Sequence, residues 1–321
     1  MSDLQPPDVT PEYLKFSPYL PGQPLAVLCS DLHLRETAPS SRAEKDWYAV
    51  MEAQLASLAH AAEALEVPII CAGDVFDKWN PSASLVRFAM EFLPQMYAIP
   101  GQHDLRYHDY TQRYEGAYGC LVAANIIRDL YPNAWATISG GNQLSVWAMP
   151  WGRWEPPTTP APMDTLGLGV LHKYAWCNEA NKHPMADETS KIEKVYPNMD
   201  ALLIGDNHVS WSLKNVLNHG GFIAQNSDQK QHIPKFGVLF ATDEGAVIRT
   251  YPYNTPEPQW VETWQPQSSD QKIAGEVITE LENLEQTGDS FMDRLKARVE
   301  TVENPAVRSK LTTILHDLQN L

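Results

Sequence analysis

Residues 25–33 read LAVLCSDLH, an apolar run that ends in an aspartate and a histidine. The pattern recurs at residues 67–77, VPIICAGDVFD, where a second apolar run ends in two aspartates. Apolar runs of this length are typical of buried strands. Ligands bind at the carboxyl ends of the strands in open α/β sheets. The two stretches therefore predict a sheet with a polar site at one edge.

Three more clusters of potential metal ligands follow strand-like segments. They are residues 101–104 (GQHD), 171–172 (LH) and 205–208 (GDNH). Carboxylates that converge at strand ends would repel one another without a cation, so a purely structural role does not explain the five clusters together. Their oxygen and nitrogen donors predict a two-metal hydrolase.

The spacing of the apolar side chains predicts alternating strands and helices. Residues 44–65 carry apolar positions three and four apart, which predicts an amphipathic helix. A shorter helix is expected over residues 82–92 and a third strand over 96–99. This alternation predicts a layered α/β fold. The second half is richer in strand candidates, at residues 143–149, 166–171, 201–204, 236–241 and 246–251.

Changes in composition predict the domain organisation. A catalytic core is expected over residues 1–253, with a Pro-rich lead-in over the first 23 residues. Residues 254–269 are rich in Pro, Gln and Thr, which predicts a linker. Residues 270–321 carry apolar side chains at helical spacing between turn signals, so we expect a helical C-terminal region.

Composition also argues against several classes of protein. The four cysteines form neither a CxxC zinc motif nor a secreted disulfide framework. The N-terminus lacks a signal-peptide pattern and no apolar run reaches membrane-spanning length, so a soluble cytoplasmic protein is expected. The net charge of −16 argues against a broad nucleic-acid-binding surface, which would be basic. Bound cations would neutralise part of this charge.

In this order, the motifs Asp-x-His, Gly-Asp-x-x-Asp, Gly-x-His-Asp, a single His and Gly-x-x-His resemble the calcineurin-like metallophosphoesterases over residues 24–253. Within that superfamily, the chain is most similar to the SbcD-type DNA-repair nucleases, in particular to phage-encoded members. Residues 218–222 and 227–234 are similar to the segment that follows the last metal motif of those nucleases. The resemblance implies a four-layered α/β/β/α sandwich with a C-terminal helical appendage.

The resemblance also implies a ligand set for two divalent cations. Metal 1 would be held by Asp31, His33, Asp74 and His208. Metal 2 would be held by Asp74, Gln102, His172 and Asp206. Carboxylate and imidazole donors together suit Mn²⁺ best, with Mg²⁺, Fe²⁺ or Zn²⁺ as alternatives. A hydroxide bridging the two metals would attack phosphorus.

The resemblance also implies roles for two residues that are not ligands, and the chain differs from the family pattern at two ligand positions. His103 would act as general acid or orient the phosphate, and Asp104 would orient the His103 ring. Gln102 stands where the family has Asn, and Asp206 stands where it has His. Both departures fall on metal 2. Asp206 makes that site harder and more anionic, which favours Mn²⁺ or Mg²⁺.

Several other side chains have two interpretations. Lys173 and Tyr174 are weak candidates for phosphate contacts, and Asp77 is expected to hydrogen-bond loop backbone rather than bind metal. His219 and His232 are weak candidates for substrate contacts. Four tryptophans could stack on nucleobases or pack in the core: Trp147, Trp151, Trp154 and Trp176.

The sequence and the resemblance together favour a Mn²⁺-dependent phosphodiesterase that hydrolyses DNA as an exonuclease or endonuclease. A small-molecule or nucleotide phosphoesterase is an alternative, since the chain is acidic. A regulatory protein with a weakened second metal site, which works by binding a partner, is another. By the same resemblance, the helices over residues 270–321 would either dock an SbcC-type ATPase or cap the core. A homodimer is allowed, and no membrane partner is expected.

Overall fold

The computed structural model describes residues 20–138, 144–182, 190–192, 198–225, 229–230 and 233–261, and three isolated positions further on, Val299, Arg308 and Thr312. The chain divides into two compact units, Met1–Val261 and Glu262–Leu321. The first unit contains every predicted metal ligand. The predicted helical region, residues 270–321, lies outside the described residues apart from the three isolated positions, so its helicity stays a prediction.

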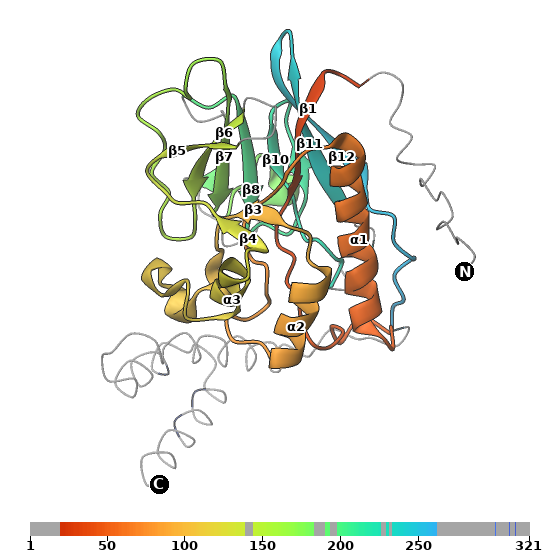
Figure 1. The fold of residues 1–321 in the computed structure, drawn as a ribbon. Coiled ribbons are helices and arrows are strands. Elements are labelled where there is room, and N and C mark those ends of the chain that lie inside the picture. Colours follow the sequence, from red (N-terminus) through yellow and green to blue (C-terminus); the bar gives the residue numbers. More distant parts are fainter. Residues whose placement is uncertain are drawn as a thin grey trace, which may run out of the picture. The chain divides into compact units, whose positions relative to one another are not determined.

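The first unit is built on two six-stranded sheets (Figure 1). The strand order of the first sheet is β12-β11-β1-β2-β3-β4. Its strands are β1 (Gln23–Cys29), β2 (Ile69–Cys71), β3 (Met96–Ala98), β4 (Ile127–Asp129), β11 (Lys235–Thr242) and β12 (Gly245–Pro252). β1 to β4 pair in parallel, whereas β11 and β12 extend the sheet in antiparallel pairing. The loops that follow β1, β2 and β3 therefore leave the sheet at the same edge.

The second sheet has the order β5-β6-β7-β8-β10-β9. Its strands are β5 (Trp135–Ile138), β6 (Leu144–Met149), β7 (Leu166–His172), β8 (Ala201–Gly205), β9 (Trp211–Ser212) and β10 (Val216–Asn218). β6, β7, β8 and β10 pair in parallel, and β5 and β9 pair antiparallel at the two ends. The expected strands of the second half are confirmed, and β5, β9 and β10 are additions that the sequence pattern did not predict.

Three α-helices cover the outer face of the first sheet. They are α1 (Trp47–Leu65), α2 (Ala83–Phe92) and α3 (Ala117–Ala123). The Asp46 carboxylate caps α1 by accepting a hydrogen bond from the Ala49 N–H at 3.1 Å, and the Ser82 hydroxyl caps α2 in the same way. The two predicted helices are confirmed, and α3 is new. Among the described residues, no helix combines the length and apolarity needed to cross a bilayer.

Buried apolar clusters define the layers. One cluster joins the helices to the first sheet, and a second fills the space between the two sheets, with Leu28, Ile70 and Val170 among its members. A third lies on the other face of the second sheet. The predicted pair of sheets is confirmed. The predicted fourth layer of helix is not found among the described residues, because half-buried side chains of irregular segments, such as Trp154 and Cys177, pack on that face.

The described part of the predicted linker, residues 254–261, packs on the first unit. The Asn254 N–H donates to the Ser57 hydroxyl at 2.9 Å, and the Val261 N–H donates to the Ser41 carbonyl at 3.0 Å. The buried Arg42 guanidinium lies 5.1 Å from the ring centroid of Trp260. The first compact unit, Met1–Val261, includes these residues.

Candidate metal centre

All seven predicted metal ligands lie at the carboxyl ends of strands. Asp31 and His33 follow β1, Asp74 follows β2, Gln102 follows β3, His172 ends β7, and Asp206 and His208 follow β8. The Asp206 N–H donates to the Asp31 carboxylate at 3.0 Å, which joins the ligands of the two sheets. The structure thus brings residues from five separate motifs into one site, as the sequence predicts.

Four of these ligands have left-handed backbone conformations that residues with side chains rarely adopt. The φ angles are 53° at Asp31, 43° at His33, 52° at Asp74 and 89° at Asp206. Such conformations cost about 1–3 kcal/mol each and cluster at functional sites. Hydrogen bonds between the loops after β1 and β2 hold them in place, from the Asp31 N–H to the Gly73 carbonyl and from the His33 N–H to the Asp74 carbonyl. The backbone is therefore organised around the ligands.

Two glycines allow the ligands to approach one another. A Cβ atom on Gly73, whose φ is +101°, would lie 2.6 Å from His172 Nδ1. A Cβ atom on Gly101 would overlap the Asp74 carboxylate and lie 2.6 Å from His172 Nε2. Both contacts are closer than real Cβ atoms tolerate. The glycines of the second and third motifs are thus required by the packing of the ligands.

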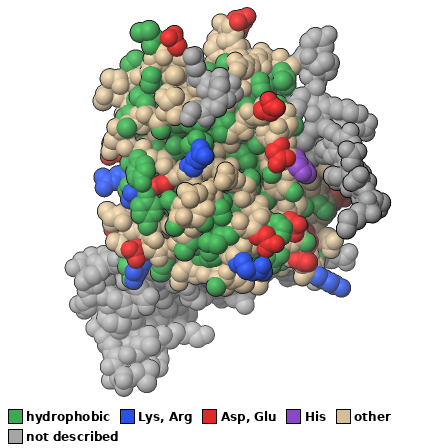
Figure 2. Space-filling model, viewed as in Figure 1, with side chains coloured by type: hydrophobic (Ala, Val, Ile, Leu, Met, Phe, Trp, Pro, Cys, Tyr) green, Lys and Arg blue, Asp and Glu red, His purple; other side chains and the backbone are tan. Residues whose placement is uncertain are grey.

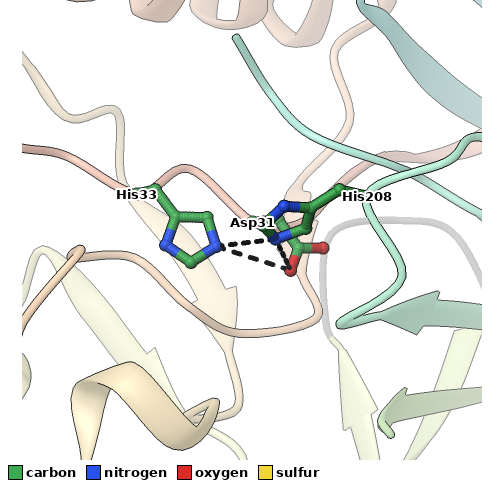
Figure 3. Close-up of side chains that lie close together, drawn as sticks. All are labelled: Asp31, His33 and His208. Atoms are coloured by element: carbon green, nitrogen blue, oxygen red, sulfur yellow. Dashed lines mark hydrogen bonds and ion pairs between the residues drawn. The ribbon is translucent and has the colours of Figure 1, made fainter. Parts of the chain in front are cut away.

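Asp31, His33 and His208 point toward a common position (Figure 3). The Nε2 atoms of His33 and His208 are 3.0 Å apart, and they lie 3.9 and 3.7 Å from Asp31 Oδ1. Asp31 and His33 are buried, whereas 39% of the His208 side chain is exposed. The three ligand atoms lie within 4.8 Å of one another, so a single ion can contact all of them. This cluster matches the predicted metal 1.

Asp74 lies between the two predicted metals. Its Oδ1 accepts a hydrogen bond from the His103 N–H at 2.9 Å. Its Oδ2 is buried without a hydrogen-bond partner, yet lies 3.6 Å from His33 Nε2 and 3.3 Å from His172 Nε2. A buried carboxylate oxygen without a partner is costly unless a cation or proton compensates it. The donor set around Oδ2 fits a divalent cation.

The predicted metal 2 residues form a continuous chain of contacts. His172 Nδ1–H donates to the Ala72 carbonyl, which turns Nε2 toward Gln102 Oε1 at 2.6 Å. Gln102 Nε2 in turn donates to Asp206 Oδ1 at 2.9 Å. The longer Gln102 side chain therefore does place its oxygen beside His172. The two residues that depart from the usual family pattern are hydrogen-bonded to each other.

His103 lies beside the ligands, with its ring centroid 4.9 Å from that of His33. Its Nδ1–H donates to the Asp77 backbone carbonyl at 2.9 Å. The Asp77 carboxylate does not bond loop backbone, contrary to prediction. It lies 3.8 Å from His33 Nδ1 and 3.8 Å from an Arg35 guanidinium nitrogen. Asp77 thus holds the His103 ring through its backbone carbonyl, and its carboxylate lies near His33 and Arg35.

The prediction that Asp104 orients the His103 ring is wrong, because the ring nitrogen bonds to the Asp77 carbonyl instead. The buried Asp104 carboxylate accepts hydrogen bonds from three backbone N–H groups at 3.0–3.2 Å, those of Val75, Phe76 and Gly101. Asp104 therefore fastens the loop after β2 to the loop after β3. It positions the site without facing it.

Burial and neighbouring charges shift the pKa values of the ligands. Burial raises the pKa of Asp31 to about 6 and lowers the pKa of His33 well below its usual range. Burial opposes the charged form of Asp74, but the surrounding histidines, with His172 first, outweigh it and lower its pKa. Burial likewise opposes charge on His172, yet the carboxylates raise its pKa to about 10, with Asp74 the largest contributor. Asp74 and His172 thus stabilise each other's charged forms.

Metal affinity should rise with pH, because a proton and a metal ion compete for the same Nε2 lone pair of His172. Since the pKa of His172 is raised to about 10, metal binding near neutrality should release about one proton, and the affinity should rise about tenfold per pH unit. Below about pH 6, Asp31 contributes a second proton and the dependence should steepen. Calorimetric titrations with Mn²⁺ in buffers of different ionisation enthalpy measure this release, and affinity independent of pH would contradict the assignment of His172.

Comparison with known proteins identifies the family. Residues 26–210 match the calcineurin-like phosphoesterases, a match that spans more than half of the 321 residues and includes all seven ligands. The chain belongs to this family. Its cluster of histidines and aspartates is of the kind that holds divalent metal in this family.

Among solved structures, the chain is similar to a candidate 5′-nucleotidase from Staphylococcus aureus, solved in complex with α-ketoglutarate. The identity is 11% and the TM-score 0.39, over 80% of this chain and 58% of that chain. The chain thus spans less than two thirds of that protein. A similarity this weak says nothing about the substrate. No curated protein matches the chain.

Two buried asparagines hold the loop of the last ligand, and the motif analysis did not single them out. Asn207 Nδ2 donates to the carbonyls of Ala175 and Asn181 at 2.7 and 2.9 Å. Asn218 Nδ2 donates to the carbonyls of Asn207 and Val209 at 2.7 and 3.0 Å. Asn218 ends the apolar strand β10, and a polar residue in that position is the signal that could have revealed it.

Burial distinguishes the side chains for which the sequence left two interpretations open. Trp147 and Trp176 are buried and donate their indole N–H groups within the protein, which confirms the core interpretation for both. His219 is buried, with 1% of its surface exposed, so the prediction that it contacts substrate is wrong.

Of the two candidates for phosphate contact, Tyr174 donates its hydroxyl hydrogen to the Asn181 carbonyl at 3.2 Å. His232 lies outside the described residues. Lys173, half-buried, remains a candidate for phosphate contact.

Asp206→His should restore the usual family ligand and raise the affinity for Zn²⁺ relative to Mn²⁺, because nitrogen is the softer donor. Asp206→Asn is the matched control, since it keeps an oxygen that can accept the Gln102 hydrogen bond but adds no imidazole. Competitive calorimetric titrations give the ratio of the two affinities. An unchanged ratio in Asp206→His would mean that residue 206 does not reach the metal.

Proposed function

We propose that this protein is a Mn²⁺-dependent two-metal phosphodiesterase that hydrolyses DNA. The observation that carries the proposal is the position of Asp74 Oδ2, which lies within 3.6 Å of the Nε2 atoms of both His33 and His172. One carboxylate between two imidazoles is suited to bridging two cations. When bound, such a pair supplies Lewis-acid stabilisation of the phosphoryl group and an activated water nucleophile.

The chain's own residues account for the remaining chemistry. His103 is held by the Asp77 carbonyl through Nδ1, which leaves Nε2 free to meet a phosphate oxygen. The carboxylates around His103, Asp74 foremost, outweigh its burial and raise its pKa. The ring thus keeps a proton that it can give to the leaving oxygen as the phosphorus–oxygen bond breaks. Asp104 and Asp77 keep the loops of the site fixed.

DNA as the substrate is supported by the similarity of residues 218–222 to SbcD-type nucleases. In the structure this segment supports the metal centre, since the Gly221 N–H donates to the His208 carbonyl at 3.1 Å. Lys and Arg side chains on the face seen in Figure 2 are scattered among acidic and apolar ones rather than gathered into a basic band. Because the chain also carries a net charge of −16, we expect DNA to bind through local contacts at the metal centre rather than through a broad basic surface.

The test compares three substrates with the Mn²⁺-loaded protein: single-stranded DNA, bis(p-nitrophenyl) phosphate and nucleoside 5′-monophosphates. We expect cleavage of the DNA and of the small diester, with slower release of phosphate from the monophosphates. Hydrolysis of monophosphates alone would replace the proposal with a nucleotide phosphoesterase. A protein that binds no stoichiometric metal and hydrolyses none of them would favour the regulatory alternative.

We also propose that the C-terminal unit, Glu262–Leu321, docks an SbcC-type ATPase. Its division from the first unit supports this role. A chain truncated after Val261 should remain folded, keep hydrolysing bis(p-nitrophenyl) phosphate and lose co-purification with the ATPase. Insoluble protein, or a large fall in the melting temperature, would instead show that the C-terminal unit stabilises the core. The cut keeps residues 254–261, which pack on the first unit.

A further inference from the structure

We propose that an aromatic and basic surface next to the metal centre binds single-stranded DNA by stacking on its unpaired bases. The inference rests on the proposed phosphodiesterase function and names the form of its substrate. We call this patch the stacking surface. It consists of His108, Tyr110, Trp151, Arg153, Trp154 and Lys173. Its members come from the segment after β3, the turn after β6 and the end of β7.

Trp151 is the member nearest to the chemistry. Its ring centroid lies 6.4 Å from that of His172, a predicted metal ligand. The Trp151 N–H donates to the Pro100 carbonyl at 3.3 Å, and Gly152 makes the following turn with a φ of +73°. Trp151 is half-buried and belongs to none of the three apolar clusters of the core. Core packing therefore does not explain a large aromatic ring in this position.

Trp154, whose ring is half-buried against the third apolar cluster, and Lys173 extend the surface on one side. The Trp154 indole N–H donates to the His172 carbonyl at 2.9 Å, which ties this ring to the same ligand. The rings of Trp151 and Trp154 are 5.5 Å apart and nearly perpendicular, at 88°. Lys173 Nζ lies 4.8 Å from the centroid of the Trp154 ring. A cation held over an aromatic ring remains available to a phosphate.

His108, Tyr110 and Arg153 extend the surface on the other side. The exposed His108 ring lies 6.5 Å from Trp151, and the Arg153 guanidinium carbon lies 6.0 Å from the Tyr110 ring centroid. The backbone at His108 is left-handed, with a φ of 51°, although this residue is not a predicted metal ligand. Such strain is typical of functional loops.

The composition of the surface selects the form of the ligand. Aromatic rings beside a few cations are the usual means of binding single strands without sequence preference, because every base has a face to stack. A duplex hides those faces. The chain carries a net charge of −16, so attraction of the DNA backbone alone is weak. Base stacking would then supply most of the affinity near the metal centre.

The test uses two hydrolysis-resistant, phosphorothioate-linked oligomers of twelve units, one of thymidine and one of abasic sites with the same backbone. Binding to the metal-loaded full chain is measured by fluorescence anisotropy. Trp151→Leu should weaken binding of the thymidine oligomer by between about fivefold and about 150-fold, the effect of losing one stacked base. It should leave the weaker binding of the abasic oligomer unchanged. Trp151→Phe should largely restore affinity for the thymidine oligomer.

Trp135→Leu is the matched control, because Trp135 lies on the edge strand β5 and is not part of the stacking surface. It should bind both oligomers as the wild type does. His108→Ala changes an exposed position and provides a second variant should Trp151→Leu fail to fold. If Arg153 and Lys173 supply the phosphate contacts, affinity for the thymidine oligomer should fall only roughly sevenfold between 50 and 200 mM salt.

Two outcomes overturn the inference in distinguishable ways. If the wild type cleaves single-stranded DNA but Trp151→Leu and His108→Ala bind both oligomers as the wild type does, the stacking surface is wrong and the proposed function stands. If the wild type binds neither oligomer and hydrolyses only nucleoside monophosphates, both the proposed function and this inference fail.

Discussion

Asp74→Ala is expected to reduce hydrolysis of phosphodiesters to background and to lower the metal bound at both sites. Asp74 is the one predicted ligand shared by the two metals, and its Oδ2 lies between the Nε2 atoms of His33 and His172. Its removal also leaves the His103 N–H without the acceptor that it has at 2.9 Å. Metal per chain, measured by plasma mass spectrometry, and turnover of bis(p-nitrophenyl) phosphate together test the prediction.

Asp46→Asn is the control for this experiment. Asp46 caps α1 at an exposed position away from the ligands, and asparagine is an equally good cap. This variant should keep both its metal and its activity. Full metal content and normal turnover in Asp74→Ala would refute the assignment of Asp74 as the shared ligand. Loss of metal at one site only would show that Asp74 does not bridge.

His103→Ala is expected to lower turnover by about 10²–10⁴-fold, the usual effect of losing general acid–base help, with metal content retained. Burial acts to lower the pKa of His103, but Asp74 and the Asp77 carbonyl outweigh it and raise that pKa. The acid form therefore persists to higher pH. The wild type should lose activity as pH rises through this pKa, and the variant should lack that decline.

Metal content is the decisive measurement for His103. The ligand atoms of His33, Asp74 and His103 lie within 4.8 Å of one another, so an ion could also be held there. A variant that loses metal together with activity would make His103 a ligand instead of an acid. His60→Ala, an exposed histidine on α1, is the matched control and should change neither quantity.

The motifs of the site could be found from the sequence because each is a short, contiguous signal. An apolar run long enough for a buried strand, followed at once by carboxylate or imidazole, predicts both a strand and what lies at its end. Asp31, Asp74 and His172 each stand in such a signal, and the structure brings them together. Short elements such as the strand β9 and the helix α3 were not predicted, because they contain too few residues to show a repeating pattern of apolar side chains.

Roles that depend on neighbours distant in the chain were decided only by the tertiary structure. Asp104 follows His103 directly, yet its carboxylate bonds to the backbone of Val75 and Phe76, and the His103 ring is held by Asp77. The direction of a polar side chain depends on which unsatisfied donors lie nearest in space. Adjacency in sequence does not reveal them.

The sequence by itself determined the motifs, the strands that carry them and, through the family resemblance, a predicted set of metal ligands. The tertiary structure decided which similar residues face solvent. Trp147 and Trp151 are close in the chain, but Trp147 lies within β6 against the core, and Trp151 lies in the turn beyond it beside His172. Burial is set by the packing of two sheets and their loops, and that packing joins residues far apart in the sequence.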